Sequence, residues 1–250
     1  MNSQRVISFL TIDNGSAVKT RRFESPTYIG DPVNTVRLWS EMCVDEIACV
    51  DISERRAPVS ERTNEISAMV DEAFVPLSIG GGIASLYDAE SLFGLGIEKV
   101  ILGWSASRTL SLADAIATRY GSQAVSCCID YTYVGTQIVT LGNRGKEVVE
   151  AREVAKIVRS LSASGIGEFI VQCVDRDGEF CGYDLQLAAE VFREAKSPVV
   201  VLGGCGDVGD VTNAHRIGCA AAAASVFVFR GKTRQVLIGN PFRDLHSWSE

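Results

Sequence analysis

The chain has 250 residues, of which 46% are hydrophobic and 22% charged, a balance typical of a globular protein. No apolar run approaches the roughly 20 residues that a membrane span needs, and the first residues do not read as a signal peptide, so we expect a cytoplasmic protein. The net charge of −7 argues against nucleic-acid partners, because a surface for nucleic acid needs clustered Lys and Arg.

Short runs rich in β-branched residues alternate with helical stretches along the whole chain, a pattern typical of strands joined by helices around a parallel sheet. Eight strands are predicted, at residues 6–12, 46–52, 75–79, 99–103, 123–129, 168–174, 198–202 and 221–227. Eight such units in one chain of this length predict an α/β fold, a single (β/α)8 TIM barrel over residues 1–250.

An internal repeat suggests how the barrel is built. Four sets of residues recur at a constant offset of 122: Val36-Arg37 and Val158-Arg159, Glu46 and Glu168, Gly81-Gly82 and Gly203-Gly204, and Gly96 and Gly218. Four coincidences at one offset are improbable by chance. We therefore expect two similar half-barrels, at about 1–120 and 121–230, followed by a tail at 231–250.

The eight cysteines form no Cys-x-x-Cys pair, and most of them lie within apolar, strand-like runs. This usage is typical of small buried side chains in a reducing compartment, so we expect neither a metal site nor a disulfide. Cys128 and Cys173 fall near strand ends, but no base that could activate either thiol is evident, which favours packing.

Glycines gather at the predicted C-terminal ends of the strands, where (β/α)8 barrels carry their active groups. Two such segments are "LGGCG" at 202–206 and "AASVF" at 223–227. Glycine lets backbone N–H groups approach an anion, and a helix start adds a favourable dipole, so together these segments predict a phosphate site. Each is weak alone, because glycine is also the usual turn residue.

Several of these segments together resemble the cyclase subunit of imidazole glycerol phosphate synthase. They are "GDP" at 30–32, "PLSIGGGI" at 76–83, "YGSQAV" at 120–125, "DRDGEFCGYDL" at 175–185 and "AASVF", and the resemblance covers residues 5 to about 230. It implies a (β/α)8 barrel that receives ammonia from a glutaminase partner through its axis. It also implies cleavage and cyclisation of a bis-phosphorylated substrate by two acids, at the ends of strands 1 and 5.

One of those two acids is replaced in this chain. The strand-5 acid is present as Asp130, whereas Thr11 stands at the strand-1 position. An alcohol cannot replace a carboxylate in general acid/base catalysis, because its pKa lies far from neutrality. The loop after strand 4 departs as well, since Gly103-Trp104 stands where the cyclases have Asn-Thr. The sequence therefore predicts one intact phosphate end and one remodelled end.

The resemblance also implies binding residues and an ammonia gate. Substrate and phosphate binding is expected at Lys19, Asp51, Gly82, Gly103, Trp104, Asp177, Gly178, Gly204, Ala224 and Ser225. For Lys19 and Asp51 a structural salt bridge is an equal alternative, and for Trp104 packing competes with stacking on a sugar or base. The gate residues at the strand starts are Arg5, Glu46, Lys99 and Glu168. Without the family, these four charges would be interpreted as a solvated rim.

Two further stretches, "AVKTRRFESPTYIGDPVNTV" at 17–36 and "FVFRGKTRQVLIGNP" at 227–241, resemble a paralogous branch associated with acetamidino modification of bacterial surface sugars. That branch implies a glutaminase, a barrel that relays ammonia, and an ATP-using sugar amidotransferase. We therefore expect a lyase or amidotransferase-type subunit without a cofactor of its own, serving amidination of a phosphorylated or nucleotide-linked N-acetylated sugar in lipopolysaccharide biosynthesis. The alternatives are an authentic cyclase of histidine biosynthesis and a non-catalytic scaffold for the glutaminase.

Overall fold

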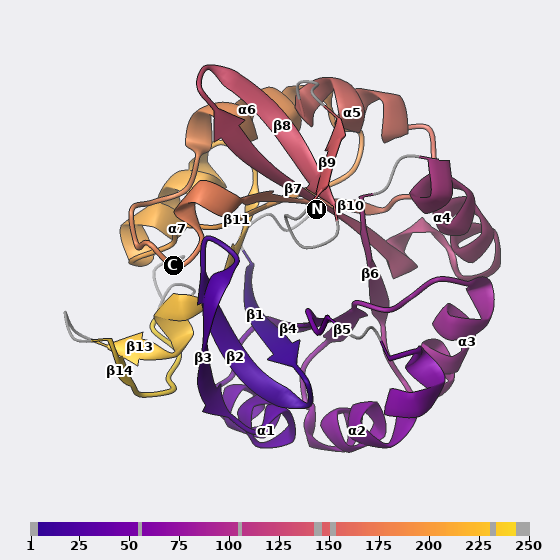
Figure 1. Cartoon of the computed structure of the whole chain (residues 1–250), viewed down its shortest axis with the longest axis vertical. Helices are drawn as coiled ribbons and strands as arrows, with labels where there is room; N and C mark the ends of the chain where they lie inside the picture. The colour runs from indigo at the N-terminus through magenta and orange to yellow at the C-terminus, as the bar shows by residue number, and fades with distance from the viewer. Residues whose placement is uncertain are drawn as a thin grey trace, which may run out of the picture.

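The computed structural model describes residues 5–54, 57–104, 107–142, 147–150, 154–230 and 234–243. Within these residues, parallel strands form a closed barrel, as the sequence predicts (Figure 1). Its eight strands are β1 (Val6–Asp13), β4 (Glu46–Asp51), β5 (Leu77–Gly80), β6 (Lys99–Gly103), β7 (Val125–Val134), β10 (Glu168–Cys173), β11 (Val199–Leu202) and β12 (Ala220–Ala223). The ring closes because β10 pairs with both β7 and β11, and β1 pairs with both β12 and β4.

Helices cover the outside of the barrel (Figure 1). Those of the described residues are α1 (Pro32–Glu41), α2 (Val59–Glu72), α3 (Leu86–Gly94), α4 (Ser107–Tyr120), α5 (Val154–Leu161), α6 (Leu185–Glu194) and α7 (Val208–Arg216). Local sequence fixes several of their starts. At the start of α1, the Asp31 carboxylate accepts a hydrogen bond from the backbone N–H of Asn34 (2.9 Å). Pro32 takes the first helical position, where an N–H would have no partner within the helix, so its missing N–H costs nothing. None of the described helices is long and apolar enough to cross a membrane.

Successive side chains of each strand point alternately outward and inward. Both faces are buried, because helices cover the outside and the inward side chains pack against one another. Outward side chains such as Leu10 and Ile47 pack against the helices in one large hydrophobic cluster. Inward side chains form a second, separate cluster along the barrel axis: Ile7, Phe9, Ala48, Ile101, Ile170, Val200, Leu202, Ala220 and Ala222. The interior of the barrel is therefore a narrow apolar core between its two ends.

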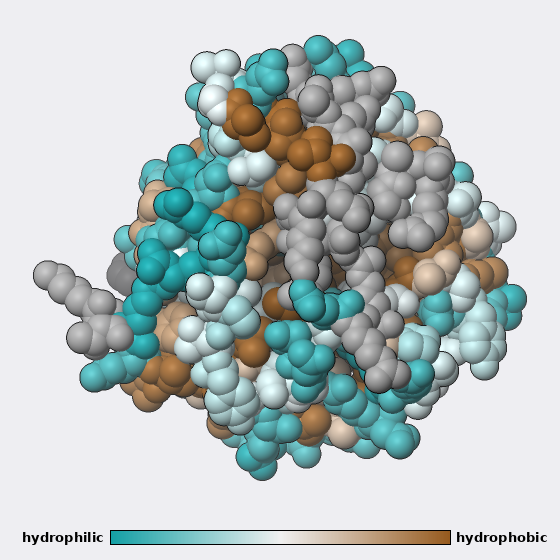
Figure 2. Space-filling view, in the orientation of Figure 1, coloured by the Kyte–Doolittle hydropathy of each residue, from teal (hydrophilic) through white to brown (hydrophobic). Residues whose placement is uncertain are grey.

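Two strand extensions at the mouth, the end where the barrel strands finish, are absent from the predicted strands. One follows β1 and consists of β2 (Ser16–Arg21) and β3 (Glu24–Gly30); the other follows β7 and consists of β8 (Gln137–Gly142) and β9 (Glu147–Glu150). In the space-filling view, hydrophobic surface gathers over the β8 region (Figure 2). Val134 at the end of β7 and Val148 on β9 are 60% and 64% exposed. The mouth is thus bordered by two hairpins.

The last predicted strand is too long. The sequence predicts 221–227, but β12 ends at Ala223, and Ser225–Phe227 form a 3-10 turn. Ala224 leaves the extended conformation, with φ −120° and ψ −75°, so the chain turns before Ser225. A short hairpin follows, formed by β13 (Phe229–Arg230) and β14 (Gln235–Val236). Of the predicted tail at 231–250, the structure describes residues 234–243.

Elements in the two halves of the chain occur at the offset of the sequence repeat. Strands β4 and β10 begin at Glu46 and Glu168, and helices α3 and α7 begin at Leu86 and Val208, so that 168 − 46 and 208 − 86 both give 122. The hairpins after β1 and β7 are a further correspondence. These positions support the half-barrel interpretation, which we retain as a proposal about how the fold is built.

Candidate functional site at the barrel mouth

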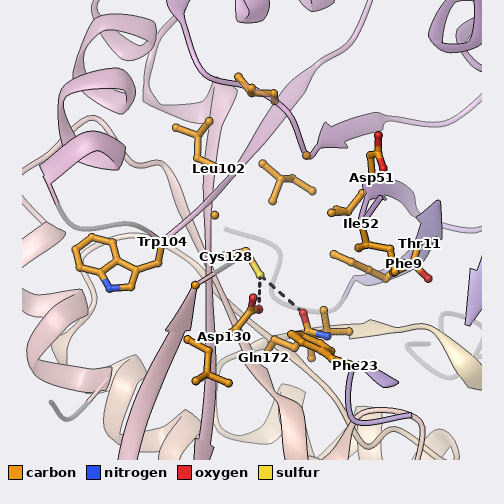
Figure 3. Close-up of a pocket in the computed structure, with 18 of the residues that line it drawn as sticks. Phe9, Thr11, Phe23, Asp51, Ile52, Leu102, Trp104, Cys128, Asp130 and Gln172 are labelled. Atoms are coloured by element: carbon orange, nitrogen blue, oxygen red, sulfur yellow. Dashed lines mark hydrogen bonds between the residues drawn. The ribbon is translucent and has the colours of Figure 1, made fainter. Parts of the chain in front are cut away.

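A cavity of about 510 Å³ lies at the C-terminal ends of the barrel strands (Figure 3). Nine of the predicted residues line it: Thr11, Lys19, Asp51, Gly82, Gly103, Trp104, Asp130, Asp177 and Ala224. A much smaller cavity is lined by the other predicted mouth residues, Gly178, Gly204 and Ser225, and shares Asp177 and Ala224 with the first. Among the described residues, no group of three or more His, Cys, Asp or Glu side chains is placed to hold a metal.

Asp130 lies on β7 with its carboxylate beside a thiol and an amide (Figure 3). The Cys128 thiol donates to Asp130 Oδ1 at 3.4 Å and lies 3.9 Å from Gln172 Oε1. Burial raises the pKa of Asp130 from 3.8 to about 7, since desolvation outweighs the hydrogen bond from Cys128. It also raises the pKa of the Cys128 thiol well above its usual value, so this cysteine is not activated as a nucleophile.

Thr11 cannot act as the missing partner of Asp130. It lies on β1, at the predicted position, and its hydroxyl donates to the carbonyl oxygen of Val18 on β2. The side chain is therefore engaged in holding the first hairpin onto the end of β1. A hydroxyl in that arrangement has no acidic proton to exchange near neutral pH.

Lys19 is a buried cation, 3% exposed, on β2. Its ammonium donates to the Phe9 carbonyl oxygen, and burial lowers its pKa from 10.5 to about 7, although the charge of Asp177 opposes that change. Asp177 in turn accepts a hydrogen bond from Thr20 Oγ1 (2.8 Å), and desolvation raises its pKa above the usual range. Lys19 is thus part of a buried strand, and not of the loop salt bridge that the sequence left open.

Asp51 ends β4, and its carboxylate is already paired. Arg62 on α2 approaches it at 3.1 Å, and the Ser53 amide and hydroxyl donate to it at 2.7 and 2.5 Å. Arg62 also donates to the Gly81 carbonyl oxygen at 3.3 Å. The salt-bridge alternative therefore holds for Asp51, although its side chain still lines the cavity. No sequence signal identified Arg62, because it lies on a helix, away from the strand ends.

Glycine is required at the small cavity but not at the remodelled loop. A Cβ on Gly204 would lie 2.1 Å from the Gly182 carbonyl oxygen, and one on Gly178 would lie 2.5 Å from that of Thr20. Both residues also have positive φ angles, of 105° and 69°. A Cβ on Gly103, by contrast, would meet nothing within 4 Å. The backbone is therefore closely packed at the small cavity and open at Gly103.

Trp104 lies at the edge of the large cavity but is only 6% exposed. Its ring belongs to the outer hydrophobic cluster, its amide donates to the Cys128 carbonyl oxygen at 2.9 Å, and its indole nitrogen is buried without a partner. In Figure 3 the indole lies away from Asp51 and Thr11, on the far side of the cavity. These observations favour packing over the stacking platform.

The four predicted gate residues meet at the opposite end of the barrel. Glu46, Lys99 and Glu168 are the first residues of β4, β6 and β10, and Arg5 directly precedes β1. Lys99 Nζ lies 3.0 Å from Glu46 and 3.1 Å from Glu168. Arg5 lies 3.2 Å from Glu46 and is also paired with Glu168. The four side chains form a closed ring of alternating charge.

The two carboxylates of this ring are buried, unlike the solvated rim that isolated strand-end charges would suggest. Glu46 and Glu168 are only 5% and 4% exposed. Each also accepts a hydrogen bond from an inward-facing serine, Ser78 to Glu46 at 3.0 Å and Ser126 to Glu168 at 2.9 Å. The apolar interior begins directly above these contacts.

Several known proteins are similar to this chain over nearly its whole length. The family described as "Histidine biosynthesis protein" matches residues 5–234. A Pseudomonas aeruginosa protein provisionally named imidazole glycerol phosphate synthase subunit hisF2 is 36% identical over 245 residues, covering 96% of this chain and 97% of the relative. A Vibrio vulnificus protein provisionally named subunit hisF3 of the same enzyme is 33% identical, covering 96% and 94%. Imidazole glycerol phosphate synthase subunit HisF of Chlorobium phaeobacteroides is 34% identical, covering 93% of each chain. The chain belongs to this histidine biosynthesis protein family, and within it is similar to imidazole glycerol phosphate synthase HisF subunits.

Proposed function

We propose that the chain is the ammonia-relaying barrel subunit of a glutamine-dependent amidotransferase system. In this scheme a glutaminase subunit docks at the N-terminal face and releases ammonia at the charged ring. The barrel passes the ammonia to its mouth, where an ATP-using partner amidinates an N-acetylated sugar that is phosphorylated or nucleotide-linked. The sugar would belong to a surface glycan such as lipopolysaccharide.

The replacement of the strand-1 acid by Thr11 is the observation that carries this proposal. The resemblance to the cyclases implies that ring closure needs two acids, and here the Thr11 hydroxyl is engaged with the Val18 carbonyl oxygen. Asp130 alone cannot both donate and accept the protons of that reaction. We infer that the barrel has kept its place in a glutamine-dependent complex while losing the cyclisation step.

The interior of the barrel supports a relay. Ammonia can cross an apolar core as a neutral molecule, whereas an ammonium ion there would pay a large desolvation cost. The inward cluster between the ring and the mouth is hydrophobic throughout. In the ring, Lys99 is paired with both Glu46 and Glu168, and these side chains close the N-terminal entrance of the barrel. Because the contacts are between side chains, they can open without unfolding a strand.

The mouth supports a ligand with one phosphate end. Backbone amides of glycine-rich strand ends surround the small cavity at Gly178 and Gly204, and such amides bind anions without a basic side chain. Gly103 offers no side-chain donor at the other end, and Trp104 is buried. In crystals soaked in phosphate, we expect an ordered ion beside Ser225; an ion ordered only beside Trp104 would reverse the two ends.

A second candidate function, that of an authentic cyclase, has one observation in its favour. Because the pKa of Asp130 is raised to about 7, this carboxyl could exchange a proton at neutral pH. Thr11 and Gly103 both oppose this candidate, since they remove the second acid and a side-chain phosphate donor.

The test is whether the purified chain, supplied with ammonium, forms imidazole glycerol phosphate from the cyclase substrate. The HisF subunit of Chlorobium phaeobacteroides serves as the positive control. We expect turnover with the control and none with this chain, while this chain supports glutamine-dependent amidination when its glutaminase and ATP-using partners are added. Robust cyclisation would overturn the proposal, and amidination that proceeds equally with the barrel omitted would do so as well.

A further inference from the structure

Asp130 differs from the other acids of the large cavity in that no cation in the described part of the chain stabilises its charge. Asp51 is paired with Arg62 at 3.1 Å, and Asp177, although it has no ion pair with another described residue, is attracted by Lys19 and accepts a hydrogen bond from Thr20. Among the described residues, no Lys or Arg lies within ion-pair distance of Asp130, and its side-chain contact is the weak hydrogen bond from the Cys128 thiol. The Asp130 carboxylate therefore faces the cavity uncompensated.

The cavity around Asp130 is suited to a positive group. Its charged lining residues are Lys19, Asp51, Asp130 and Asp177. Arg62 compensates Asp51, which leaves two acids, Asp130 and Asp177, against the single base Lys19. Gln172 Oε1 lies on the same side as the Asp130 carboxylate, next to Cys128, and adds a second acceptor (Figure 3). An anion would be repelled from this end, so the phosphate end of a ligand must lie elsewhere.

We propose that Asp130 anchors a cation-binding site, and that its ligand is the amidinium group of an acetamidino-substituted sugar. This inference rests on the proposed function, which supplies the amidination chemistry. An amidinium group is planar and carries two parallel N–H donors, which match the two oxygens of one carboxylate, as a guanidinium does. A cavity of about 510 Å³ has room for the sugar that bears the group.

Binding at this site must depend on pH, because the amidinium pairs with the ionised form of Asp130. The titratable and charged groups that face it are Cys128 on the same strand, Asp177 after β10, Lys19 on β2, and Asp51 with Arg62 across the cavity. The Asp130 pKa of about 7 means that the carboxyl is largely protonated at pH 6 and ionised at pH 8. Affinity for a cation should therefore rise with pH over this interval, and Lys19 strengthens the trend as it loses its charge.

Acetamidinium chloride is the probe, titrated into the purified chain at constant ionic strength and followed by calorimetry or protein NMR. Acetamide, which has the same shape without the charge, is the matched ligand control. We expect acetamidinium to bind at pH 8 and acetamide not to bind. Lowering the pH to 6 should weaken acetamidinium binding about tenfold, because only about a tenth of the carboxyl stays ionised.

Asp130→Asn should reduce acetamidinium affinity at least tenfold, whereas Glu41→Gln, the same change on an exposed helical acid, should leave it unaltered. If acetamide binds as tightly as acetamidinium, the proposed site is wrong. The same holds if the acetamidinium affinity changes neither with pH nor on Asp130→Asn. Ammonium chloride that binds as tightly as acetamidinium would overturn the amidinium assignment. The ligand comparison and the pH series use the unaltered chain, so they decide the question even where the variant folds poorly. None of these titrations needs glutamine or a partner enzyme, so their failure is distinguishable from failure of the relay.

Discussion

Replacing Lys99 with methionine removes one charge from the ring at the base of the barrel while keeping most of the side-chain volume. Lys99 is the shared partner of Glu46 and Glu168, whose side chains are 7% and 6% exposed. Breaking a buried ion pair costs about 3–5 kcal/mol, since it leaves a buried charge uncompensated. Arg5 and two serines still contact the carboxylates, so we expect the lower end, a loss of about 3 kcal/mol in the free energy of unfolding.

Urea unfolding measures this loss, with Arg159→Met as the matched control. Arg159 pairs with Glu194 on the surface, where the two side chains are 70% and 30% exposed, so its replacement should cost less than about 1 kcal/mol. In the reconstituted complex, Lys99→Met should also waste glutamine, lowering product per glutamine hydrolysed more than it lowers ammonium-supported product formation. A stability loss equal to that of the control would refute the buried network, and equal loss with both nitrogen sources would refute the gate.

Three further outcomes are expected. Thr11→Asp should leave cyclisation with ammonium near background, because Gly103 still supplies no phosphate donor; strong activity in a product assay would contradict this. Gly204→Ala should destabilise the fold by about 2 kcal/mol or more, since its Cβ would lie 2.1 Å from a carbonyl oxygen. The control Gly103→Ala should change stability by less than about 0.5 kcal/mol, because its Cβ would meet nothing within 4 Å. Equal unfolding midpoints for the two variants would refute this distinction. Because the folded-state pKa of Asp130 is raised, its ionisation should destabilise the fold as pH rises from about 4 to 8. The free energy of unfolding of Asp130→Asn should therefore rise, relative to that of the unaltered chain, by up to about 4 kcal/mol over that interval, as measured by urea unfolding at both pH values.

The barrel strands could be predicted because a strand buried on both faces leaves a strong local signal, a short run of β-branched residues between turn residues. The hairpin after β1 left no such signal. Its second strand, Glu24–Gly30, is exposed over most of its length and contains Pro26, which a sequence pattern assigns to a loop. The hairpin forms because Val18 pairs with Thr11 beyond the end of the barrel, a contact that local propensity does not encode.

The end of β12 was missed for a related reason. Apolar residues continue from 220 to 228, interrupted only by Ser225, so no glycine or proline marks a stop. The chain leaves the sheet because β1 pairs with β12 only as far as Ser8 and Ala223, and then pairs with the returning strand β2. A strand boundary set by competition for one partner strand is invisible to a local pattern.

The residues of the site could be named from the sequence, but their partners could not. Asp51 was identified through the resemblance to the cyclases, yet Arg62 lies on the following helix and reaches it only in the folded chain. Gln172 was not selected, because a single glutamine at the end of an apolar strand carries no pattern. The burial of Lys19 is likewise a product of the hairpin. In each case the missing information is a contact between distant segments.

The two ends of the barrel handle buried charge in opposite ways. At the base, every carboxylate of the ring has a cationic partner and a serine donor, an arrangement complete without any ligand. At the mouth, Asp130 is held in a poorly solvated place with a thiol as its hydrogen-bond donor, which raises its pKa and costs stability whenever it ionises. Folding alone gives no reason to retain such a group, since an asparagine of nearly the same shape would avoid the cost. Buried groups that destabilise a fold are concentrated at functional sites, so we infer that Asp130 serves a ligand and not the barrel.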